Sequence, residues 1–133
     1  KENHKLLIEG TEKAFEAALE NCHVGKKLGD LGHAVYETAI GNMHSVALGL
    51  MGHGIGRSLH EKPDVLNFGK PDTGLELFEG LSICIEPILI DGPYSIKELE
   101  DGWTLVTEDG AFAAHYEHTV AITKDGPLVL TRD

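Results

Sequence analysis

Gly52-His53-Gly54-Ile55-Gly56-Arg57-Ser58-Leu59-His60-Glu61-Lys62-Pro63 is the stretch around which the rest of this chain is organised. Glycines alternate around the first histidine, a second histidine follows, and a proline closes the run. Alternating glycines let the backbone adopt a positive φ or pass close to another group. The stretch is therefore either a Gly-rich turn with two surface histidines or a backbone that places His53 and His60 beside a site.

Two amphipathic helices are predicted before this stretch. Apolar residues recur every three or four positions from His4 to Cys22, where Ile8, Phe15, Leu19 and Cys22 form one stripe, and again from Gly29 to Ile40. Gly25 breaks the pattern between them and is typical of a helix end. Each helix has one apolar face, and a sheet is the obvious surface to cover it.

The remainder of the chain supplies the strands of that sheet. Short apolar or alternating segments bounded by turn residues predict strands at Ser45–Met51, Leu81–Ile90, Trp103–Thr107, His115–Thr123 and Leu128–Thr131. The segments Gly52–Gly56 and Gly69–Gly74 are expected as loops, Lys124–Gly126 as a hairpin turn, and Ile96–Glu100 is ambiguous. Two helices followed by largely antiparallel strands define the α+β class.

Composition narrows the class of protein. The 133 residues suffice for one domain with a core, and no apolar run is long enough to span a membrane. A net charge of −11 repels nucleic acid, and the Gly-rich stretch lacks the Lys-Ser/Thr of a phosphate-binding loop. Cys22 and Cys84 are expected as reduced core thiols of a cytosolic protein, with a disulfide between them left open. The first residue, Lys1, is not Met, so we expect a processed, truncated or engineered piece of a longer protein.

Glu86 is the one charged residue in the predicted strand Leu81–Ile90. Side chains alternate along a strand, so Glu86 shares a face with Cys84. An isolated carboxylate there is costly unless it is paired, hydrogen-bonded or metal-bound. The alternative is an edge strand, which Pro87 favours, with Glu86 pointing to water.

A second carboxylate, Glu117, is predicted on one face of the strand His115–Thr123 together with His115. Taken alone, this face fits a solvent-exposed polar stripe. Taken together, His53, Glu86 and Glu117 form a set of one imidazole and two carboxylates that suits Mn, Fe, Co or Zn. A bridging carboxylate holds two such ions about 3.5 to 4 Å apart, as in two-metal hydrolases.

Five motifs in the chain together resemble the type I methionine aminopeptidases. In chain order they are Gly52–Arg57, His60-Glu61-x-Pro63, Ile85–Pro87, Asp101–Thr104 and Tyr116–Thr119. The resemblance extends over essentially the whole chain. It implies that residues 1–133 are a single domain matching the C-terminal half of the catalytic domain, with two helices on a mainly antiparallel curved sheet in the pita-bread (creatinase/aminopeptidase-like) fold.

The resemblance also implies a role for each matched residue. His53, Glu86 and Glu117 would bind a pair of divalent ions, with Glu117 bridging them and Glu86 handling the proton of the attacking water. His60 would contact the substrate and the tetrahedral species of the reaction. Leu59 and Trp103 would form walls of the pocket for the methionine side chain. The implied reaction removes the N-terminal methionine of nascent proteins and peptides in the cytoplasm.

Two departures from the family pattern are visible. The family's other metal ligands are two aspartates of the preceding half, and none of the aspartates here corresponds to either of them. His115 stands where relatives more often have a neutral polar residue, so it is either a partner of Glu117 or a spare ligand. The active unit is therefore expected to need the N-terminal half or a second copy of the chain. The alternative is a catalytically incomplete relative that binds a metal or a partner protein.

Overall fold

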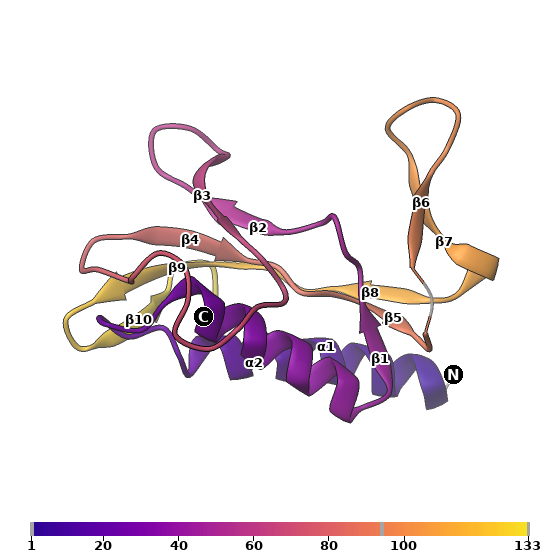
Figure 1. Cartoon of the computed structure of the whole chain (residues 1–133), viewed down its shortest axis with the longest axis horizontal. Helices are drawn as coiled ribbons and strands as arrows, with labels where there is room; N and C mark the ends of the chain where they lie inside the picture. The colour runs from indigo at the N-terminus through magenta and orange to yellow at the C-terminus, as the bar shows by residue number, and fades with distance from the viewer. Residues whose placement is uncertain (1, 94, 133) are drawn as a thin grey trace.

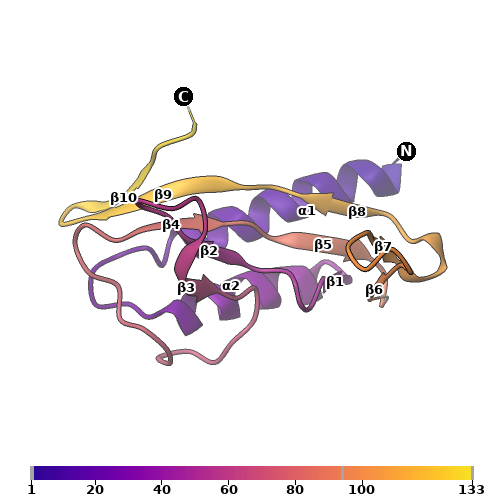
Figure 2. The ribbon, with the colours of Figure 1, turned by 90° about the horizontal axis from the view of Figure 1, so that it is seen from above.

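The computed structural model describes residues 2–93 and 95–132. Two helices, α1 (Glu2–Leu19) and α2 (Leu28–Gly41), lie side by side and cover one face of a layer of strands (Figures 1 and 2). Asp30 stabilises the start of α2, because its carboxylate accepts a hydrogen bond from the backbone N–H of Lys27 at 2.8 Å. Neither helix combines the length and the apolar character that crossing a membrane requires, over the residues searched.

The buried face of α1 differs from the predicted stripe at one position. Ile8 is 53% exposed, whereas its neighbour Leu7 is buried. Leu7 begins a series of buried residues spaced by three or four positions, which includes Ala14, Phe15 and Ala18. The predicted stripe was wrong at Ile8 because one residue of offset moves a side chain about 100° around a helix.

The strands form two main sheets and a separate hairpin, and every pairing is antiparallel. One sheet has the order β10-β9-β4-β2-β3, the second the order β1-β5-β8, and β6 pairs with β7. The bounds are β1 His44–Val46, β2 Gly52–Gly54, β3 Glu61–Val65, β4 Ser82–Ile85, β5 Ile88–Asp91, β6 Ile96–Glu98, β7 Leu105–Thr107, β8 Ala113–His115, β9 His118–Thr123 and β10 Gly126–Val129. The predicted α+β class is confirmed.

Two segments that the sequence predicts as continuous strands are each interrupted. Leu81–Ile90 divides into β4 and β5 at Glu86-Pro87, and His115–Thr123 divides at Tyr116-Glu117. A proline has no N–H to donate to a ladder, which explains the first interruption. Ile85 of β4 pairs with His118 of β9, and Ile88 of β5 pairs with His115 of β8, so the two breaks face each other.

The Gly-rich stretch also differs from its prediction, because Gly52–Gly54 is strand β2 rather than a loop. β2 lies between β3 and β4. A Cβ at Gly52 would lie 2.0 Å from the carbonyl oxygen of Cys84, and one at Gly54 would lie 2.3 Å from that of Lys62. Positive φ occurs at other glycines, not at these two, so close approach of neighbouring strands is what requires glycine here.

Several shorter predictions need adjustment. The predicted strand Ser45–Met51 is reduced to β1, since Gly49 turns the chain with a φ of 92°. Trp103 lies before β7 rather than in it, β3 was not predicted, and the ambiguous segment contains β6. The turn before Gly126 joins β9 to β10 as predicted.

The core lies between the helices and the sheets, and both cysteines belong to the buried part of the chain. Cys22 and Cys84 are both buried, and neither forms a disulfide in the structure. Burial raises the pKa of the Cys22 thiol to about 12, which keeps it protonated and unreactive. The thiol of Cys84 lies 3.3 Å from the hydroxyl of Thr119 on the neighbouring strand.

Candidate metal centre

Three of the predicted site residues converge at the two facing strand breaks. His53 comes from β2, Glu86 from the break between β4 and β5, and Glu117 from the break between β8 and β9. Each offers one ligand atom, and these atoms all lie within 4.8 Å of one another. The His53 and Glu86 side chains are only 12% and 14% exposed, whereas Glu117 is exposed. The fold therefore assembles two carboxylates and one imidazole from distant parts of the sequence.

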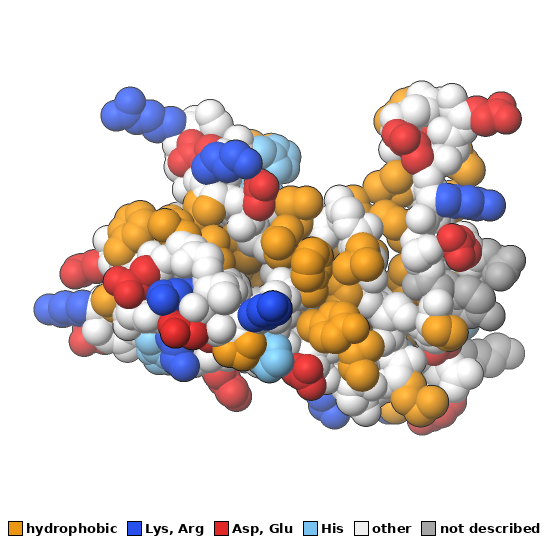
Figure 3. Space-filling model, viewed as in Figure 1, with side chains coloured by type: hydrophobic (Ala, Val, Ile, Leu, Met, Phe, Trp, Pro, Cys, Tyr) orange, Lys and Arg blue, Asp and Glu red, His pale blue; other side chains and the backbone are white. Residues whose placement is uncertain are grey.

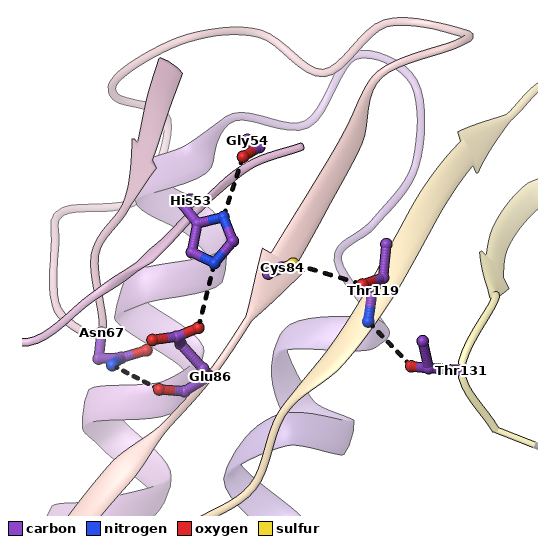
Figure 4. Close-up of polar contacts among 7 residues, drawn as sticks. All are labelled: His53, Gly54, Asn67, Cys84, Glu86, Thr119 and Thr131. Atoms are coloured by element: carbon purple, nitrogen blue, oxygen red, sulfur yellow. Dashed lines mark hydrogen bonds and ion pairs between the residues drawn. The ribbon is translucent and has the colours of Figure 1, made fainter. Parts of the chain in front are cut away.

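The orientation of His53 directs one ring nitrogen at Glu86. Its Nδ1 lies 2.9 Å from the backbone oxygen of Gly54, and a carbonyl oxygen can only accept, so Nδ1 carries a hydrogen (Figure 4). In the neutral ring, Nε2 then presents a lone pair, and it lies 3.5 Å from Oε2 of Glu86. Two acceptors at this separation require a proton or a cation between them.

The carboxyl of Glu86 is the most perturbed group of the cluster. Its Oε2 is buried and has no hydrogen-bond partner among the described residues. Burial, together with the adjacent Glu117 carboxylate, raises the pKa of Glu86 from its usual 4.5 to about 8. The pKa of Glu117 is lowered, first by its interaction with Glu86 and then by the nearby histidines. A divalent cation would satisfy the unpartnered oxygen and both charges, so the donor set fits a metal ion.

The structure also brings two further histidines to this cluster. The ring of His60 lies 4.2 Å from that of His53, centroid to centroid, at an angle of 59°. His115 is the last residue of β8 and helps to lower the pKa of Glu117 through its charge. Both histidines are therefore close enough to act on Glu117 through their charge.

The two residues expected as pocket walls lie on separate projections of the molecule. Leu59 is in the loop between β2 and β3 and is 68% exposed, and Trp103 is in the turn between β6 and β7 and is 78% exposed. Figure 1 shows both projections rising from the side of the sheet opposite the helices. Figure 3 shows the surface hollowed between them, with hydrophobic side chains along its floor.

Sequence reasoning missed one residue that contacts this centre. Asn67 is 1% exposed, and its Nδ2 donates a hydrogen bond to the backbone oxygen of Glu86 at 3.2 Å (Figure 4). The sequence gives only a slight indication of this role, because Asn67 is a single polar residue in a short apolar run that includes Val65, Leu66 and Phe68.

Comparisons with known proteins agree with this arrangement. Residues 1–124 match the family model "Metallopeptidase family M24". The methionine aminopeptidase of Clostridium perfringens is 44% identical over 130 residues, which are 98% of this chain and 52% of that protein. Crystal structures of methionine aminopeptidases from Rickettsia prowazekii and Thermotoga maritima both superpose with a TM-score of 0.95 at 40% identity.

The superpositions cover 99% and 100% of this chain but 54% and 53% of the two solved chains. The chain thus spans about half the length of these relatives and corresponds to their C-terminal portion. The predicted pita-bread architecture is confirmed by the superpositions. Because the family model matches all but the last residues, the chain belongs to metallopeptidase family M24.

Proposed function

We propose that this chain is the C-terminal half of the catalytic unit of a methionine aminopeptidase, which removes the N-terminal methionine from nascent proteins and peptides. Its similarity to methionine aminopeptidases over nearly its whole length supports this activity. The observation that carries the proposal is the convergence of His53, Glu86 and Glu117, with an oxygen of Glu86 that is buried and has no hydrogen-bond partner among the described residues.

These three residues would hold divalent metal, with two ions of Co, Mn, Fe or Zn in the complete site and Glu117 shared between them. When bound, such ions lower the pKa of water and polarise the scissile carbonyl. The complete site needs further ligands from outside this chain, since His53, Glu86 and Glu117 form the one donor cluster within residues 2–93 and 95–132.

The roles of the chain's own residues follow from their positions. Glu86, whose carboxylate lies in the cluster beside His53, would accept the proton of the attacking water once a bound cation has displaced its own proton. His60, whose ring lies beside that of His53, would donate a hydrogen bond to the oxygen on which negative charge develops. His115 would hold Glu117 ionised through its charge.

Substrate and partner follow from the same assignment. Leu59 and Trp103, on the two projections beside the centre, would contact the methionine side chain once the rest of the unit is in place. The partner would be the N-terminal half of the unit, or a second copy of this chain. The protein would act in the cytoplasm, where nascent chains emerge, without nucleic acid or membrane as a partner.

One observation favours a second candidate function. The single cluster in the described part of the chain offers three donors, and the chain spans about half of its relatives. A fragment of this kind could bind a metal ion or a partner protein without turnover.

Release of methionine from a short Met-Ala peptide separates the two candidates. The assay uses the chain alone and the chain mixed with the N-terminal half of the Clostridium perfringens relative, with each of the four metals. We expect release in the mixture, and we expect His53→Ala to abolish it while His33→Ala on α2 does not. If the chain binds metal but no methionine is released under any condition, the enzymatic function is refuted and the metal- or partner-binding function remains.

A further inference from the structure

The break between β4 and β5 lies outside the hydrogen-bonding ladders of both sheets. Glu86 and Pro87 belong to neither strand, and Pro87 has no N–H. Two hydrogen bonds hold this segment instead. The backbone N–H of Tyr116 donates to the oxygen of Pro87 at 3.2 Å, and Asn67 Nδ2 donates to the oxygen of Glu86 at 3.2 Å. The direction of the Glu86 side chain therefore depends on contacts outside the ladders.

Asn67 reaches Glu86 from a third part of the chain. β3 ends at Val65, which pairs with Gly52 at the start of β2, and Asn67 follows two residues later. The same strand pair carries His53, so Asn67 links the β2–β3 pair to the Glu86 break (Figure 4). One side chain thus ties the segment that bears the imidazole to the segment that bears the carboxylate.

The chemistry of Asn67 is unusual for its surroundings. It is 1% exposed, and its Oδ1 has no hydrogen-bond partner within the described residues. A buried amide is unfavourable unless its hydrogen bonds compensate. An apolar residue of the same volume would fill the space without leaving an acceptor unsatisfied. Packing therefore does not explain an asparagine here, whereas its bond to Glu86 does.

We propose that Asn67 is a positioning residue, which fixes the Glu86 segment so that the carboxylate faces Nε2 of His53. The effect of Asn67 on metal affinity rests on the proposed function. Its role in anchoring the segment between β4 and β5 does not depend on that function. Hydrogen-bonding partners of this kind typically change metal affinity by about 10- to 100-fold.

Asn67→Leu tests this role, because leucine has nearly the shape of asparagine but cannot donate a hydrogen bond. In the metal-free full chain we expect the Tyr116 amide to exchange its hydrogen at least about tenfold faster, while amides of the β9–β10 hairpin are unchanged. With Co²⁺ as the probe, we expect about 10- to 100-fold weaker binding and an altered visible absorption spectrum of the bound ion.

Asn42→Leu is the matched control, because its amide also donates to a backbone oxygen, that of Thr38 at 3.0 Å, but at the end of α2. This control should leave both readouts unchanged. Asn67→Ala, which also lacks a donor, serves the same purpose as Asn67→Leu if the leucine variant does not fold. Exchange at Tyr116 that is unchanged, or accelerated equally with the hairpin, would overturn the proposal.

Hydrogen exchange at Tyr116 and Co²⁺ binding together distinguish a failure of the positioning role of Asn67 from a failure of the proposed metal centre. If the unsubstituted chain binds no Co²⁺, the metal centre is refuted, and the exchange of Tyr116 still decides the role of Asn67. If Co²⁺ binds equally well to the unsubstituted chain and to Asn67→Leu with the same spectrum, the positioning role is refuted although the metal centre stands.

Discussion

Glu86 shows how the fold holds one carboxyl group uncharged until a cation arrives. Its pKa is about 8 in the folded chain because burial disfavours the charged form, and about 4.5 in an unfolded chain. Between these values the folded state binds more protons than the unfolded state, so the free energy of unfolding falls as the pH rises. A cation displaces the proton and removes this penalty, so metal binding and stability are linked at one residue.

We therefore predict that the metal-free chain loses thermal stability between about pH 4.5 and about pH 8, the range in which Glu86 is protonated in the folded state but ionised in the unfolded chain. Glu86→Gln cannot ionise, so its unfolding temperature should decline less over this range. The contribution of Glu117 has the opposite sign, because its pKa is lowered, and it is lost only below about pH 4.5. Calorimetric melting of both proteins across this range is the measurement. Parallel curves would contradict the assignment.

A second prediction concerns His53 as a metal ligand. Removing one of three ligands should weaken binding of Mn²⁺ or Co²⁺ by roughly 100-fold or more, since even a partner of a ligand is worth about 10- to 100-fold. Titration calorimetry of His53→Ala against the unsubstituted chain measures this loss. His33→Ala is the matched control, because His33 lies on α2 outside the cluster. Equal binding by all three proteins would exclude His53 as a ligand.

Single residues also show what sequence can and cannot reveal about the centre. Glu86 could be singled out because a charge inside an apolar, strand-like run is costly and so calls for a partner, whereas Glu117 gained weight only in combination with His53 and Glu86. Asn67 could not be identified from the sequence. Its burial depends on where β3 ends relative to β2, and hydrophobic periodicity does not reveal its contact with Glu86.

Among the elements, the two interrupted strands place the centre. The pairings of Ile85 with His118 and Ile88 with His115 leave Glu86 and Glu117 in opposed gaps of the sheet. A continuous ladder would keep each backbone segment fully hydrogen-bonded and would leave no room for side chains to converge. Pro87 explains the break between β4 and β5. From sequence alone it favoured only an edge strand, although a missing N–H suits both.

At the same scale, β2 depends on glycine for its close packing. A Cβ at Gly52 would meet the carbonyl oxygen of Cys84 at 2.0 Å, and a backbone atom cannot move aside as a side chain can. Gly52→Ala should therefore destabilise the chain by about 1–3 kcal/mol or more, through overpacking. Urea denaturation is the measurement.

Gly41→Ala provides the contrasting control for this substitution. Gly41 ends α2, and an added Cβ there would meet nothing within 4 Å. Alanine should stabilise the helix by about 0.5–1 kcal/mol. If the two substitutions changed the free energy of unfolding by similar amounts, the close approach of the neighbouring strand would not be the reason that position 52 requires glycine.

For the whole molecule, the helix layer and the α+β class could be predicted from periodicity and turns, but the number of strands and their order in the sheets could not. The order β10-β9-β4-β2-β3 places β4 between β2 and β9, which are both distant from it in sequence, and only tertiary packing decides such neighbours. The same packing leaves one face of the molecule apolar. Tyr36 and Ile40 of α2 are 40% and 49% exposed, and Leu48, which follows β1, is 56% exposed.

This apolar face leads to the prediction for the whole chain, which is association. Tyr36, Ile40, Val46 and Leu48 line a shallow groove of about 260 Å³ beside β1, an edge strand that pairs with β5 on one side. Exposed apolar surface next to an unpaired strand edge favours a partner. We expect the isolated chain to self-associate, and the N-terminal half of a relative to replace that contact with a one-to-one complex.

Light scattering over a range of concentrations measures this association. Ile40→Asp should shift the chain towards monomer, because a charge in the groove must be desolvated when a partner covers it. Leu105→Asp on the β6–β7 hairpin is the control, since Leu105 is 43% exposed, close to the 49% of Ile40, but lies outside the groove. If the chain stays monomeric at every concentration and does not bind the added N-terminal half, this face needs no partner.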